Sequence, residues 1–196
     1  MDFILVFVVL LVCLTLGAIV LALSLSPSAK DKERNWIPGT NFIPSQMFMG
    51  SDGLGGIAVN EKIFQICLLK RPAVPPRSLH ISHLVSSFLI KNGEILGEGL
   101  RTGPSTLLSF QKIMRPDVEK LIQSSQASSS QPGNQRIDLL ILIHDEVDPL
   151  HMVNFLDMET KEGGILYEKA LGTARHWHNV MNGLISQADQ LACLQT

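Results

Sequence analysis

The longest hydrophobic stretch of the chain lies near its N-terminus. Between Phe3 and Leu25 the only ionisable group is the thiol of Cys13, and seventeen of the 23 residues are Leu, Val, Ile or Phe. A helix of this length is roughly 35 Å long, which is enough to cross a hydrocarbon core of about 30 Å. The pattern therefore predicts a single membrane-spanning helix with its ends at Phe3 and Leu25.

A cleaved signal peptide is the alternative interpretation, because Ser28 and Ala29 could end a small-residue cleavage site. Two features favour an uncleaved signal anchor over residues 1–29: no basic residue precedes the apolar run, and the run is longer than the apolar region of most signal peptides. Basic side chains follow the span, beginning at Lys30. The positive-inside rule therefore predicts a single-pass protein of the inner (plasma) membrane with a cytoplasmic C-terminal domain.

Short β-rich runs recur after a juxtamembrane linker at residues 30–50. Two hairpins are predicted, one turning around Glu61 and one at Asn92-Gly93, the dipeptide preferred in type I′ turns. Between them, residues 70–77 contain three prolines and are expected to form a stiff basic connection without strand pairing. The run 137–143 is apolar on both faces, which predicts a central strand, and residues 151–156 are its expected partner.

Helical spacing of apolar residues marks the middle of the chain less clearly. Residues 105–114 fit a helix, and Pro116 suits the first position of a second short helix that ends at Ile122. The pattern does not decide between helix and strand over the whole of 105–122. Residues 123–135 contain one apolar side chain, Ala127, and are expected to form a flexible loop.

The C-terminal region has the clearest helical pattern. Apolar residues recur every three or four positions from Ile165 to Leu191. This spacing predicts a long amphipathic helix that buries Trp177 against the sheet. Together the elements predict an α+β fold: a soluble domain over residues 51–196 with a mainly antiparallel sheet, capped by the C-terminal helix.

Three segments carry a family resemblance. GIAVNEKIFQICLL, SHLVSSFLIKNGEIL and ILYEKALGTARHWHNVMNGLI resemble uncharacterised bacterial membrane-anchored proteins with a pleckstrin-homology-like domain, and the resemblance covers roughly residues 51–185. It implies a small barrel capped by a C-terminal helix and a binding or scaffolding role. It brings no catalytic residue with it, and the polar insert around residues 124–134 departs from the family pattern.

The glycine-rich stretch from Gly50 to Asn60, GSDGLGGIAVN, raises the question of a phosphate-binding loop. Such a loop follows a strand and opens a helix, because the helix N-terminus supplies the amides that hold the phosphate. Here β-rich runs follow, and no Gly-Lys-Ser/Thr motif is present. We interpret the glycines as a flexible lead into the first strand, without a phosphate site.

Charge and cysteine content exclude further classes of function. From Lys30 onward the chain holds all 16 basic residues and 17 of the 18 acidic ones, a net charge of −1, so nucleic-acid binding is not expected. The three cysteines, Cys13, Cys67 and Cys193, do not form a disulfide framework. Cys67 lies in an apolar run, where burial raises the pKa of a thiol and leaves it inert.

Candidate chemical groups do not form a catalytic or metal-binding motif. His80 and His83 are spaced as HxxH without the glutamate of zinc peptidases, and His176 and His178 lie on different sides of the predicted helix. The acidic turn after His144 is expected to be solvated. There is no GxSxG motif, and the serines at 128–130 lie in the flexible tract. We therefore expect no catalytic residue, no cofactor and no metal.

These observations predict a membrane-tethered interaction or assembly module that is not an enzyme. Its expected partners are the lipid bilayer, reached through the N-terminal helix, and a protein bound by the cytoplasmic domain, with self-association left open. Lys70, Arg71 and Arg77 are candidate contacts for anionic lipid headgroups. The alternative is a membrane-anchored hydrolase or metal-binding enzyme whose histidines and acidic residues converge only in the fold. The arrangement of His80, His83, His144 and Asp145 distinguishes the two hypotheses.

Overall fold

The computed structural model describes residues 42–70, 74–128 and 133–194. These residues belong to one compact unit, Ile37–Thr196. The predicted span between Phe3 and Leu25 lies outside the described ranges. Within those ranges, no helix combines the length and the apolar character needed to cross a membrane.

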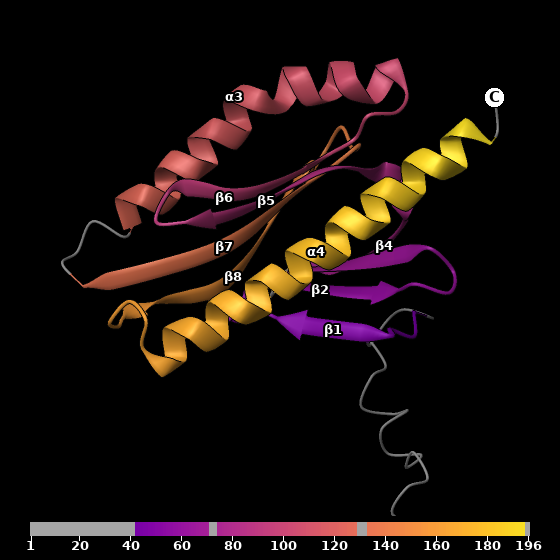
Figure 1. Ribbon diagram of the computed structural model, residues 1–196. Helices are drawn as coiled ribbons and strands as arrows, with labels where there is room; N and C mark the ends of the chain where they lie inside the picture. Colours follow the sequence, from indigo (N-terminus) through magenta and orange to yellow (C-terminus); the bar gives the residue numbers. More distant parts are fainter. Residues whose placement is uncertain (1–41, 71–73, 129–132, 195–196) are drawn as a thin grey trace, which may run out of the picture. The chain divides into compact units, whose positions relative to one another are not determined.

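The described chain forms two antiparallel four-stranded sheets and two long helices (Figure 1), which confirms the predicted α+β class. The first sheet has the order β1-β2-β3-β4, with strands Gln46–Met49, Gly55–Asn60, Gln65–Lys70 and Val74–His80. The second has the order β6-β5-β7-β8, with β5 Leu84–Lys91, β6 Glu94–Leu100, β7 Asn134–Ile143 and β8 Leu150–Glu159. The helices are η1 Ile81–His83, α3 Ser105–Ser128 and α4 Ile165–Cys193.

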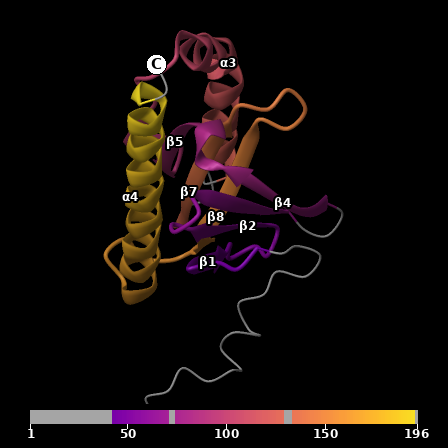
Figure 2. The same cartoon turned by 90° about the vertical axis from the view of Figure 1, so that its right-hand side faces the viewer.

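Opposite faces of the second sheet pack against different elements. On one face, alternate residues of β7 join the main core with α4 and with the inward residues of β2 and β3. On the other face, residues of β5 and β7 pack against α3. Figure 2 shows α4 standing along one side of the sheets. Strand β7 lies between β5 and β8, which confirms the prediction of a central strand.

The glycine-rich stretch is a hairpin turn and not a lead into the first strand. Strand β1 precedes the turn, in the range expected to be linker, and pairs with β2, which forms the second half of the stretch. Gly53 has a φ of 67°, a conformation that favours glycine. Strand β2 then turns back into β3, as predicted. Since a strand and not a helix follows the turn, the helix N-terminus that a phosphate loop requires is absent here.

The proline-rich segment pairs as a strand, so the prediction of an unpaired connection was wrong. Strand β4 contains Pro75 and Pro76 and pairs with β3, with Arg77 opposite Leu68. Strand β4 is the last in its sheet, and an edge strand tolerates proline because half of its N–H groups need no partner. The pairing register also shifts between Leu68 and Lys70.

The second predicted hairpin is confirmed. Strands β5 and β6 pair on either side of Asn92-Gly93. Asn92 has a φ of 49° and Gly93 a φ of 82°, the two left-handed conformations that a type I′ turn requires.

Helix α3 is one continuous helix, so the prediction of two short helices was wrong. It contains Pro116 in its interior, where a proline removes one backbone hydrogen bond. It also continues to Ser128 through part of the segment expected to be a loop, and β7 already begins at Asn134. Ser125 is buried in this region, and its hydroxyl is satisfied by a 2.9 Å hydrogen bond that it donates to Asp138 on β7.

Helix α4 confirms the predicted C-terminal amphipathic helix. Trp177 is 4% exposed and lies in the main core. Its ring is 6.4 Å from that of Phe48 on β1, and Phe48 in turn stacks on Phe155 of β8. Both sheets therefore meet the same face of this helix.

Candidate interaction site

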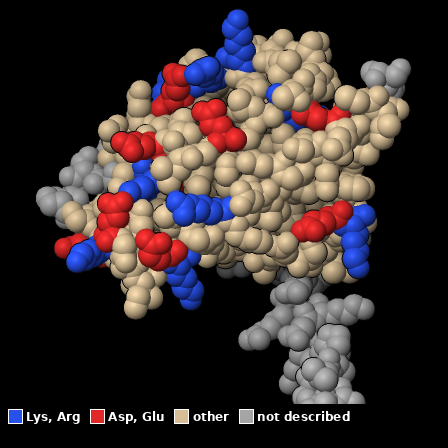
Figure 3. Space-filling model, viewed as in Figure 1, with Lys and Arg blue, Asp and Glu red and all other residues tan. Residues whose placement is uncertain are grey.

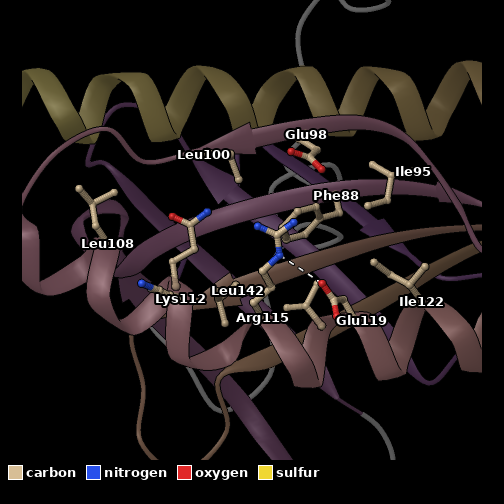
Figure 4. A pocket seen from close by; sticks show the side chains of 12 residues that line it. Phe88, Ile95, Glu98, Leu100, Leu108, Lys112, Arg115, Glu119, Ile122 and Leu142 are labelled. Atoms are coloured by element: carbon tan, nitrogen blue, oxygen red, sulfur yellow. Dashed lines mark hydrogen bonds and ion pairs between the residues drawn. The ribbon is translucent and has the colours of Figure 1, made fainter.

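A hollow opens between helix α3 and strands β5 and β6. Its volume is about 230 Å³. Figure 4 shows α3 along one side of the hollow and β6 along the other. The buried residues that line it are all apolar: Phe88, Val118, Ile122 and Leu142.

Helix α3 contacts the sheet along one of its faces, and the hollow lies beside this line of contact. Near its start, Leu107 packs with Val85 and Leu142. Farther along, a second cluster joins α3 to the sheet through Val118, Ile122, Phe88, Ile90 and Leu140. On the side of the helix that faces the hollow, longer polar side chains are presented, namely Gln111, Lys112 and Arg115. Polar side chains keep their ends in water, so they leave space above the sheet unfilled.

The shape of α3 fits this arrangement. Figure 1 shows the helix changing direction partway along its length. Pro116 lies near the middle of the helix, and proline is a common cause of such a bend. Beyond the bend, the buried hydrogen bond from Ser125 to Asp138 ties the helix to β7. Asp138 also accepts hydrogen bonds from Asn154 at 2.8 Å and from Arg136 at 2.7 Å, so its buried carboxylate is fully satisfied.

Both signs of charge stand around the mouth of the hollow. Arg115 donates a 3.1 Å hydrogen bond to Glu119 one turn along α3. Glu98 on β6 and Lys112 on α3 form no ion pair within the described part of the chain. On the face shown in Figure 3, acidic and basic side chains are likewise intermixed. The mouth is therefore acidic on its β6 side, at Glu98, and carries both signs of charge on its α3 side.

Three large apolar side chains border the hollow while remaining exposed to water. Ile95 and Leu100 on β6 and Leu108 on α3 are each 42% exposed. Isolated exposed apolar residues are ordinary, whereas a cluster beside a concave apolar surface is typical of interaction sites. The hollow can thus receive an apolar group of a partner, and the exposed side chains at its rim would become buried when that group binds.

Sequence reasoning missed this site. The apolar positions noted between residues 105 and 114 describe helical spacing, but they do not show which face of the helix meets the sheet. Leu108 and Glu98 line the same hollow only because α3 packs on the sheet beside β6. One sequence feature could have indicated the site. Leu108, Val118 and Ile122 form a row of apolar residues along the helix, beside the row that includes Leu107.

The candidate lipid contacts lie elsewhere, on the first sheet. Lys70 is bonded to both carboxylate oxygens of Asp148, at 2.5 and 2.6 Å, and Arg77 forms an ion pair with Asp145. The hydrogen bond from Arg77 is the main reason why the pKa of Asp145 lies below its ordinary value. Arg71 lies outside the described residues. Since Lys70 and Arg77 each face a carboxylate, the local charge available to an anionic headgroup is largely offset.

The histidines and acidic residues of the alternative hypothesis are only partly brought together. His83 and His144 are neighbours through a 3.3 Å contact between the His83 ring and the His144 carbonyl. The His144 ring packs on Phe110, while His80 accepts a hydrogen bond from the backbone of Ser82. Among the described residues, no three His, Cys, Asp or Glu side chains are grouped so that they could hold a metal ion.

His176 and His178 point to different sides of α4, as predicted. His176 is exposed and bonds to Gln46, whereas His178 is buried, and burial lowers its pKa. The His178 ring lies 3.3 Å from the hydroxyl of Ser87, a pairing that the sequence did not indicate. Ser87 is fully buried and donates its proton to Asn182 at 2.9 Å. The cluster therefore joins α4 to β5 and offers no accessible nucleophile.

Cys67 is fully buried, and burial raises the pKa of its thiol to about 11. A thiol with this pKa stays protonated at neutral pH, so it is a weak nucleophile and a weak metal ligand.

Comparisons of this chain with protein-family models, with curated proteins and with solved structures found no match.

Proposed function

We propose that the chain is a membrane-tethered interaction module that binds a protein partner in the hollow between α3 and β6. In this proposal the apolar run from Phe3 to Leu25 anchors the chain in the plasma membrane, and the domain acts on the cytoplasmic side. Its role is binding or assembly and not catalysis. The hydropathy of the run and the basic residues that follow it support the anchor and the orientation.

The open apolar hollow is the observation that carries the proposal. At about 230 Å³ it lies below the range of about 300 to 1,000 Å³ that is typical of small-molecule sites. It matches better the pocket that receives one large side chain at the centre of a protein interface. The exposed rim residues Ile95, Leu100 and Leu108 would extend such an interface beyond the hollow.

We also propose that the two sheets and α4 form a small barrel of the pleckstrin-homology type. The antiparallel order of both sheets, their shared contact with α4 and the C-terminal position of that helix support this assignment. Helix α3, inserted between β6 and β7, is then an addition that supplies one wall of the hollow.

Site-specific photo-crosslinking in cells tests the proposed function. A benzophenone amino acid replaces Leu108 in the full-length chain, and a matched chain carries it at Ile113, which is 71% exposed on the same helix but does not line the hollow. We expect a discrete protein adduct from position 108 that is lost when Leu100→Glu is introduced into the same chain. Identical adducts from both positions, or no adduct from position 108, would contradict the proposal.

A further inference from the structure

No strand pairs with the outer edge of β6 within the described part of the chain, while α4 packs against the face of β6 that carries Gly97 and Gly99. Strand β6 is the last in the order of its sheet, and β5 is its only partner strand among the described residues. An unpaired edge presents a row of backbone N–H and C=O groups that can template another strand. Three residues of the same strand, Ile95, Glu98 and Leu100, line the hollow. The free edge and the hollow therefore form one continuous surface.

We infer that the partner binds as an extended segment that pairs with the edge of β6 and places one bulky apolar side chain in the hollow. This inference rests on the proposed function and names the form of its ligand. In strand addition, backbone hydrogen bonds provide affinity, and pockets beside the edge select alternate side chains. Helix α3 would close the hollow over the inserted side chain from the opposite wall (Figure 4).

The dimensions of the two walls agree with a short segment. The lining residues of α3 run from Leu108 to Ile122, which corresponds to roughly 21 Å along a helix. Strand β6 spans seven residues, about 23 Å of extended chain. A segment of about six or seven residues would therefore cover the whole site.

The charge of β6 favours a basic partner over a second copy of this chain. The strand contains Glu94 and Glu98 and no basic residue, and neither carboxylate has an ion-pair partner within the described residues. Two β6 edges would bring like charges together, which is unfavourable between paired strands. Lys112 stands on the opposite wall, so a segment paired with β6 meets Glu98 first. The partner segment should accordingly carry Lys or Arg next to its apolar side chain.

Peptide binding to the full-length chain in detergent tests the inference. The probe is fluorescein-labelled Thr-Lys-Thr-Trp-Thr-Lys-Thr, which reads the same in both directions, so strand polarity does not affect the result. We expect binding by fluorescence anisotropy. Replacement of the tryptophan by alanine should weaken binding about thirtyfold, as for a central interface residue. N-methylation of the three central residues should weaken it by about tenfold or more, because it removes backbone donors while keeping the side chains.

A charge exchange provides the sharpest control. Glu98→Lys should weaken binding of the basic peptide about fivefold and strengthen binding of Thr-Glu-Thr-Trp-Thr-Glu-Thr by a similar factor. Glu146 is exposed in the loop between β7 and β8 and does not line the hollow. Glu146→Lys makes the same change in net charge as Glu98→Lys and should leave both affinities unchanged.

The possible outcomes distinguish a failure of strand pairing from a failure of the proposed function. Equal binding of the N-methylated and unmodified peptides would overturn strand pairing, and so would the absence of binding at about 1 mM peptide. If the adduct from position 108 persisted in that case, the hollow would still be an interaction site with a partner of another geometry. If Glu98→Lys and Glu146→Lys changed the affinities for the two peptides equally, Glu98 would have no specific role in binding.

Discussion

At the scale of single residues, His151 shows how a buried polar group joins the two sheets. It is 1% exposed on β8, and its Nε2 lies 2.7 Å from the carbonyl oxygen of Gly56 on β2. Its Nδ1 is buried without a hydrogen-bond partner. Neutral imidazole fits this site because the protonated Nε2 can donate to Gly56, while a second proton would have no acceptor. Burial accordingly lowers the pKa of His151 to about 4.

This residue should make the stability of the domain depend on pH. The folded state holds the pKa of His151 at about 4, below its value of 6.5 without the fold, so the unfolded state binds the proton more readily. The contribution of neutral His151 to the stability of the fold is complete above pH 6.5 and is lost as pH falls towards 4. The loss should reach about 3 kcal/mol, measured by denaturant unfolding of the full-length chain with tryptophan fluorescence.

His151→Gln is the matched variant, because glutamine can still donate to Gly56 but does not titrate. It should flatten the pH dependence in this window. Part of the slope should remain, since the lowered pKa of His178 contributes in the same direction. An unaltered slope in His151→Gln would mean that His151 is accessible to protons in the folded state.

At the scale of elements, the approach of α4 to β6 depends on glycine. A Cβ atom at Gly99 would overlap the side-chain oxygen of Asn182, and one at Gly97 would come within 2.8 Å of the His178 ring. Asn182 cannot move away freely, because it bonds to both Ser87 and His178. Two glycines of β6 therefore set the distance between the helix and the sheet.

Alanine substitutions should separate packing from helix propensity. Gly99→Ala should destabilise the domain by about 1 to 3 kcal/mol, the usual cost of overpacking. Gly183→Ala, on α4 with nothing within 4 Å of the added Cβ, should stabilise it by about 1 kcal/mol. Thermal unfolding of both full-length variants gives the comparison. Stabilisation by both substitutions would show that α4 does not contact β6 as described.

At the scale of the whole molecule, the proposed function requires the anchor and the domain to act together. The folded unit Ile37–Thr196 contains its own core, so the apolar run is expected to supply location and not stability. The run contains one pair of small residues, Gly17-Ala18, and no GxxxG motif, so it offers little for helix dimerisation.

Exchange of the apolar run should therefore preserve function, whereas its deletion should not. With residues 3–25 replaced by an unrelated single span, the chain should resist carbonate extraction and give the same adduct from position 108. A chain that lacks residues 1–29 should be released from membranes and lose the adduct. Retention of the adduct by the released chain would show that the partner is not reached through membrane location.

The sequence alone determined the features that depend on neighbours along the chain. Asn92-Gly93 predicts its turn because both residues adopt left-handed conformations readily, and the row that includes Trp177 predicts α4 because helical spacing selects one face. The continuous apolar run around Leu140 likewise identifies a strand buried on both sides.

The tertiary structure decided the features that depend on which surfaces meet. Pro75 and Pro76 can join a strand because β4 is at a sheet edge, and Pro116 can lie inside α3 because contacts on both sides of it hold the helix on the sheet. The hollow exists only because α3 packs on β5 and β7 beside β6. Local patterns report the preferences of a few adjacent residues, whereas edge position, burial and close approach are set by contacts between residues far apart in the chain.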